Sequence, residues 1–144
     1  MDDINDRKKM AWEGWFYAIQ RIDLLIISIS GAGIYVVLET LKYSIEKTLS
    51  NVWQIKGAGI LFVAAIVINF LSQFTGKEAN GHEMKMCAVK LSANKKKISK
   101  NKKLISKHDT LATIYTNWTN FFNMFSFILM VGALIMVMYF FITF

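Results

Sequence analysis

Residues 121–144, FFNMFSFILMVGALIMVMYFFITF, form an apolar block without a single charged side chain. As an α-helix with a rise of about 1.5 Å per residue, the block is about 36 Å long, which is enough to cross a hydrocarbon core of about 30 Å. A soluble protein of 144 residues has too little other surface to cover such a helix on every side. The block therefore predicts a transmembrane helix over 119–144.

Two further blocks predict two more spans. Residues 57–74, GAGILFVAAIVINFLSQF, meet the usual length for a span. The block between Asp23 and Glu39 is shorter, about 22 Å as a helix, so a span over 21–42 must include flanking residues whose charged groups reach the headgroups. A re-entrant or interfacial helix is the alternative there. The predicted fold is an all-α integral membrane protein with three transmembrane helices.

Composition excludes several other classes of protein. The chain is 54% hydrophobic and carries a formal charge of +7, and a disordered polycation would have far fewer apolar residues. Cys87 is the only cysteine, which excludes a disulfide-stapled secreted domain. The apolar residues occur in blocks rather than along amphipathic elements, and this argues against a soluble nucleic-acid binder.

The basic residues predict the orientation of the chain. Fourteen of the 17 Lys and Arg residues lie in the N-terminal segment up to Arg21 or between the second and third spans. Because cytoplasmic loops collect positive charge, we expect a multi-pass protein of a bacterial inner membrane with a cytoplasmic N-terminus and an external C-terminus. Residues 1–20 would be a cytoplasmic amphipathic or interfacial helix and residues 43–56 an external loop. The tryptophans agree, since all of them fall near predicted span ends: Trp12, Trp15, Trp53 and Trp118.

Residues 75–118 are too long for a simple turn and contain no proline. Met84, Cys87 and Leu91 recur at helical spacing, and a second helical pattern runs from Leu104 to Trp118. We therefore expect spans two and three to continue as helices into the cytoplasm and to form a basic helical hairpin. The two extensions would pair with each other or with the helix near the N-terminus.

The tip of this hairpin is strongly basic and predicts a membrane-surface or partner-binding patch. Its lysines are Lys95, Lys96, Lys97, Lys100, Lys102 and Lys103. A solvated turn that fixes the topology, attraction to anionic headgroups, and binding of nucleic acid or a nucleotide second messenger are the three interpretations. The loop has no arginine, and no aromatic residue lies between Phe74 and Tyr115, so bidentate phosphate contacts and base stacking are missing and nucleic acid is not expected as a partner.

Five amide side chains lie near the predicted inner ends of two spans. Asn69 and Gln73 are four residues apart, and Asn117, Asn120 and Asn123 follow a three-residue repeat. Each set is predicted to share one face of its helix. The amides would either form hydrogen bonds between helices or line a water-filled vestibule of a pore.

Small residues in the spans predict close approach of helices. They are Ser28, Gly31, Ala32 and Gly33 in the first span, Gly57 and Gly59 in the second, and Gly132 in the third. Packing within one chain and a seam between copies are both consistent with this pattern, and a homo-oligomer would be needed to enclose a pore.

No catalytic or metal-binding motif emerges from the sequence. His82 and Cys87 are five residues apart without further ligands, and His108 next to Asp109 has no nucleophile at a meaningful spacing. We therefore expect no enzyme activity, no cofactor and no metal.

In size, number of spans, absence of a catalytic motif and basic helical segment, the chain resembles small multi-span effector or accessory proteins of bacterial anti-phage systems, including those beside CRISPR and cyclic-nucleotide signalling genes. The resemblance is architectural and covers the whole chain, and holins and other small membrane subunits share it. It implies a homo-oligomeric inner-membrane effector that forms a pore or perturbs the bilayer. The alternative is a non-conducting subunit that anchors or assembles a larger complex with a cytoplasmic protein partner.

Overall fold

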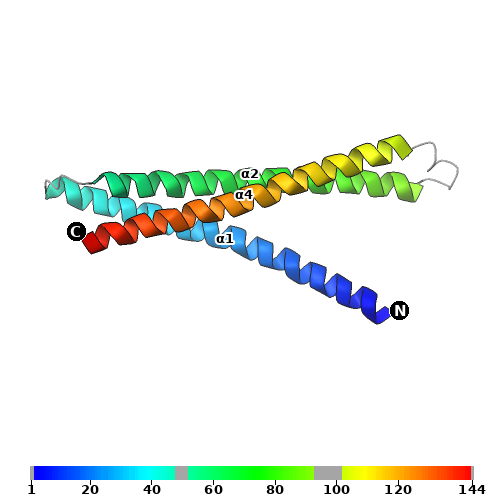
Figure 1. Cartoon of the computed structure of the whole chain (residues 1–144), viewed down its shortest axis with the longest axis horizontal. Helices are drawn as coiled ribbons and strands as arrows, with labels where there is room; N and C mark the ends of the chain where they lie inside the picture. The colour runs from blue at the N-terminus through cyan, green and yellow to red at the C-terminus, as the bar shows by residue number, and fades with distance from the viewer. Residues whose placement is uncertain (1, 48–51, 93–101, 144) are drawn as a thin grey trace. The chain divides into compact units, whose positions relative to one another are not determined.

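The described part of the chain consists of three long helices and contains no strand (Figure 1). The computed structural model describes the backbone of residues 2–47, 52–92 and 102–143, and the side chains of residues 17, 19–47, 52–90 and 102–143. The helices are α1 (Asp2–Glu46), α2 (Trp53–Ser92) and α4 (Lys102–Thr143). Each contains a segment long and apolar enough to cross a membrane, which confirms the all-helical prediction with three helices of spanning length.

The helices extend well beyond the predicted spans. α1 runs through residue 20 without a break, so the predicted N-terminal helix and the first span are one element. α1 continues to Glu46 and α2 starts at Trp53, which leaves fewer residues between them than the predicted loop 43–56. The chain contains no proline, and residues 39–46 contain no glycine either, so α1 has no backbone reason to end where the predicted span ends.

Buried positions along α2 follow a repeat of three and four residues. They are Ile55, Ala58, Phe62, Ala65, Asn69, Ser72, Ala79 and Met86. This is the heptad spacing by which helices pack side by side at a shallow angle. The seam is apolar up to Ala65, polar at Asn69 and Ser72, and apolar again at Ala79 and Met86.

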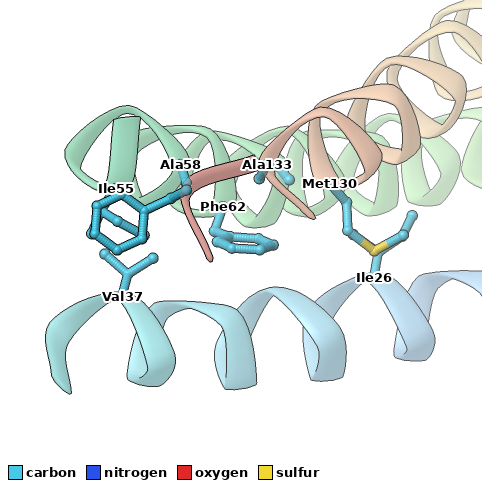
Figure 2. Packing of buried hydrophobic residues seen from close by; sticks show 9 residues of the cluster. Ile26, Val37, Ile55, Ala58, Phe62, Met130 and Ala133 are labelled. Atoms are coloured by element: carbon cyan, nitrogen blue, oxygen red, sulfur yellow. The ribbon is translucent and has the colours of Figure 1, made fainter. Parts of the chain in front are cut away.

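The chain divides into two compact units, which are described separately. The three-helix unit comprises residues 1–66 with 126–144, and the two-helix unit comprises residues 67–125. The core of the three-helix unit draws on all three helices, as Figure 2 shows: Ile26 and Val37 from α1, Ile55, Ala58 and Phe62 from α2, and Met130 and Ala133 from α4.

Phe62 is the largest fully buried side chain, and Gly33 of α1 makes room for it. A Cβ atom on Gly33 would overlap the ring of Phe62, whereas a Cβ on Gly31, two residues earlier, would meet nothing within 4 Å. Gly59 likewise lets α2 approach Val37, whose Cγ1 would lie 2.9 Å from a Cβ there. The close contact between α1 and α2 therefore depends on particular glycines and not on small residues in general.

We predict that Gly33→Ala destabilises the protein by about 1–3 kcal/mol, the usual cost of overpacking a core. Gly31→Ala is the matched control and should be neutral or stabilising by up to about 1 kcal/mol, because alanine favours the helix and meets no neighbour. Thermal unfolding of both variants in detergent micelles checks the pair. Equal effects of the two substitutions would contradict the packing of Gly33 against Phe62.

Candidate functional site

The two-helix unit pairs α2 with α4 around a largely polar seam. Asn69 and Ser72 are completely or almost completely buried, and Ala79 and Met86 continue the same side of α2. A polar group buried among helices is costly unless it has a hydrogen-bond partner. The hydrogen-bond partners of Asn69 and Ser72 therefore indicate how α2 and α4 pair.

Hydroxyl groups connect the two helices at the centre of this seam. The Ser72 hydroxyl lies 3.1 Å from the carbonyl oxygen of Thr119 and also within hydrogen-bond distance of the Asn123 amide oxygen. Thr75 and Thr119 bring their hydroxyl oxygens to 2.9 Å. The Thr119 hydroxyl also donates to the carbonyl of Tyr115 at 2.8 Å. We call Ser72, Thr75, Thr119 and Asn123 the hydroxyl–amide cluster.

The predicted amide residues separate into two groups. Asn69 is fully buried and accepts a hydrogen bond of 3.1 Å from the exposed Gln73, as the four-residue spacing allows. Asn123 is half-buried and contacts Ser72, but Asn117 and Asn120 are exposed. A step of three residues turns a helix by about 300°, so a three-residue repeat drifts away from the seam.

The two histidines of the chain meet further along the same helix pair. His82 of α2 and His108 of α4 place their Nδ1 atoms 3.0 Å apart. The His82 ring also stacks on Tyr115, with centroids 5.7 Å apart and planes inclined by 10°. Sequence reasoning compared each histidine only with its neighbours in the chain and missed this pair. The heptad repeat could have revealed the pair, because residues seven positions apart lie on the same face of a helix. His82 follows Thr75 by seven residues, and His108 precedes Tyr115 by seven.

In this region α2 packs through a different face from the one that carries Met84 and Cys87. Met84 is 73% exposed and Cys87 is also exposed, whereas Ala79 and Met86 are buried. The helical spacing of Met84 and Cys87 therefore does not mark the face of α2 that packs against α4. Ala79 and Met86 follow Ser72 at intervals of seven residues and continue its buried face along α2. Met84 and Cys87 lie on the exposed side of the helix.

The basic tip lies partly outside the described residues. Lys95, Lys96, Lys97 and Lys100 belong to the segment that is not described, while Lys102 and Lys103 are exposed at the start of α4. Lys77, Lys85 and Lys90 are exposed on α2 of the same unit.

The small residues of the spans fall into two groups, those that face a neighbouring helix and those that do not. Gly33, Gly57 and Gly59 face neighbouring helices, and a Cβ on Gly57 would lie 2.8 Å from the methyl carbon of Met136. Ser28, Gly31 and Ala32 lie on the exposed side of α1. Gly132 is half-buried, and a Cβ there would meet nothing within 4 Å.

Two surface hollows accompany the helix pair. Asn117, Trp118 and Phe121 line an apolar hollow of about 280 Å³. The other, of about 190 Å³, has a mixed lining that includes Glu83 and Asp109. Within residues 17–90 and 102–143, as far as side chains are described there, no group of three His, Cys, Asp or Glu residues could hold a metal ion.

Comparison of the chain with known protein families, characterised proteins and solved structures finds no match.

We predict that Ser72 and Asn123 are energetically coupled. Ser72→Ala and Asn123→Ala should each destabilise the protein, and a double-mutant cycle should give a coupling of about 0.5–2 kcal/mol, as for hydrogen bonds between membrane helices. Denaturant titration in mixed micelles measures it. The matched control combines Ser72→Ala with Asn120→Ala, an exposed amide one turn away, and should show additivity. Additivity in both cycles would refute the Ser72–Asn123 interaction.

Proposed function

We propose that the chain is a small multi-pass membrane protein that anchors or assembles a membrane complex and does not itself conduct ions. The observation that carries the proposal is the pairing of polar side chains inside one chain. Asn69 and Ser72, the fully buried polar residues of the two-helix unit, are turned toward the interior of that unit and do not face outward.

Insertion in a bilayer accounts for the exposed apolar surface. In the candidate spans only 22%, 33% and 22% of the most apolar window is buried inside the structure. Large side chains such as Phe70, Phe121 and Tyr139 are more than half exposed. An apolar surface of this extent is unfavourable in water and favourable in lipid.

The hydroxyl–amide cluster supports an anchoring role over a conducting one. A pore needs polar groups that face a common aqueous axis and can replace the hydration of an ion. In this chain Ser72, Thr119 and Asn123 bind one another across α2 and α4, and Asn69 accepts from Gln73. Such bonds strengthen in a medium of low dielectric constant and hold the two helices in one register.

α2 is longer than a membrane span needs, and its excess length forms an arm outside the bilayer. α2 has 40 residues and is therefore about 60 Å long, about twice the thickness of a hydrocarbon core. Its second half carries the exposed Lys77, Lys85 and Lys90 and pairs with α4 through Thr75–Thr119 and His82–His108. We propose that this paired, basic arm lies in the cytoplasm and receives a protein partner or anionic lipid headgroups.

A homo-oligomeric pore-forming effector, such as one of anti-phage defence, is the second candidate. Two observations favour it. Asn117 and Asn120 are exposed, and Ser28, Gly31 and Ala32 form an exposed small-residue face on α1. In this alternative the α1 face would be the seam between copies, and the two amides would line the mouth of the pore.

Flux measurements separate the two functions. The full chain is reconstituted in phosphatidylethanolamine–phosphatidylglycerol vesicles, with gramicidin as the positive control for potassium flux. We expect no potassium or dye flux above that of empty vesicles, because Asn69 and Ser72, the buried polar residues of the two-helix unit, are already hydrogen-bonded. Flux that is abolished by Asn120→Leu and retained by Phe121→Leu would establish the pore and overturn the anchor.

An assembly role also predicts a specific neighbour in the cell. A photo-reactive residue in place of the exposed Lys85 should form one defined adduct with a heterologous protein, whereas the same residue in place of the exposed Tyr35 should contact lipid. Adducts at Lys85 with other copies of the chain alone would favour the homo-oligomer.

The proposed orientation is checked with the native thiol. Cys87 is free and exposed, so a membrane-impermeant maleimide should label it in inside-out vesicles and not in intact cells. Lys47 is exposed next to the end of α1, and Lys47→Cys in a Cys87→Ser background should show the opposite pattern. The reverse result would invert the topology.

A further inference from the structure

The two histidines of the chain, 26 residues apart in sequence, form one pair in the two-helix unit. Their Nδ1 atoms lie 3.0 Å apart and their ring centroids 5.2 Å apart. Both side chains are half-buried, one on each helix. The hydroxyl–amide cluster already holds α2 and α4 together in this unit, so the helix pair has a hydrogen-bonded support besides the histidines.

The pair is held in place by an aromatic neighbour. The ring of Tyr115 lies nearly parallel to that of His82, with a centroid distance of 5.7 Å and an inclination of 10°. Tyr115 is on the same helix as His108, two turns further along. Stacking therefore fixes one imidazole relative to the helix that carries the other, which is the kind of preorganisation that a ligand site needs.

The separation of the nitrogens matches a chelated metal ion. An ion about 2.0–2.1 Å from each nitrogen, the usual metal–imidazole distance, would subtend an N–metal–N angle of about 95° across the 3.0 Å gap. Square-planar and tetragonal ions have ligand angles near this value, whereas a tetrahedral ion needs a wider one. Imidazole nitrogen combined with oxygen ligands in such geometry is typical of Cu(II) and Ni(II).

We propose that His82 and His108 form a two-histidine site for a divalent ion of the copper and nickel class. Both rings ligate in the neutral form through Nδ1. The ring that donates in the histidine pair moves its proton to Nε2, so binding exchanges one hydrogen bond for two metal–nitrogen bonds without net proton release. In this geometry each metal–nitrogen bond is inclined by about 40° to the line between the two nitrogens. The rings turn toward the ion by rotation about χ2, which is a soft torsion.

Water completes the coordination sphere. Glu83 and Asp109 follow the two histidines directly in sequence and line the nearby hollow. Among the described side chains, however, no third His, Cys, Asp or Glu joins the pair as a ligand. The site is therefore open to solvent ligands, and its structural effect is to link the α2 and α4 halves of the two-helix unit.

The test uses the full chain in detergent, without a polyhistidine tag, in a Cys87→Ser background that removes the exposed thiol. After treatment with EDTA and its removal, the protein is titrated with Cu²⁺ and with Ni²⁺. His82→Asn and His108→Asn are the variants, because the asparagine amide occupies the place of Nδ1 and preserves hydrogen bonding. Circular dichroism confirms that each variant is helical.

We expect one Cu²⁺ per chain, an axial electron paramagnetic resonance spectrum with coupling to two nitrogens, and a higher Tm with the ion bound. Either asparagine variant should weaken binding about tenfold or more and remove the shift in Tm. Binding that the variants leave unchanged, coupling to fewer than two imidazole nitrogens, or no binding at all would overturn the site. Each result is independent of whether the chain anchors a complex or conducts ions.

Discussion

A polar group inside a helix bundle must find a hydrogen-bond partner when water is excluded, and this requirement organises α2 and α4. Along α2 the buried seam is apolar from Ile55 to Ala65, polar at Asn69 and Ser72, and apolar again at Ala79 and Met86. Between Ile55 and Ala65, apolar side chains pack against the neighbouring helices. In the polar part, Ser72, Thr75 and the amides need specific partners, and those partners set the register of the helix pair.

The three-helix unit has a core in which apolar side chains of all three helices fit closely together. Gly33 admits the ring of Phe62, and Gly59 admits Val37, so α1 and α2 approach closely at these two points. Lipid tails are as apolar as the side chains, and close packing is therefore the force that distinguishes a helix contact from a lipid contact. Ser28 and Gly31 lie on the exposed side of α1, and among the described residues a Cβ on Gly31 would meet nothing within 4 Å.

The proposed anchoring function and the proposed metal site both depend on the polar seam between α2 and α4. The same register that brings Ser72 to Asn123 places His82 beside His108. The arm is then a preorganised helix pair in which a bound ion adds a cross-link. The exposed lysines, among them Lys85 and Lys102, remain free to contact a partner or a lipid surface.

The sequence by itself determined the number and the approximate positions of the helices, because apolar length and the absence of proline are local properties. It also determined that Asn69 and Gln73 share a face, since their spacing is one helical turn. Only the tertiary structure decided that Met86 and not Met84 is buried, that Gly33 and not Gly31 is packed, and that the two histidines meet. These outcomes depend on which face of each helix turns toward its neighbour, and that choice is made by the partner helix.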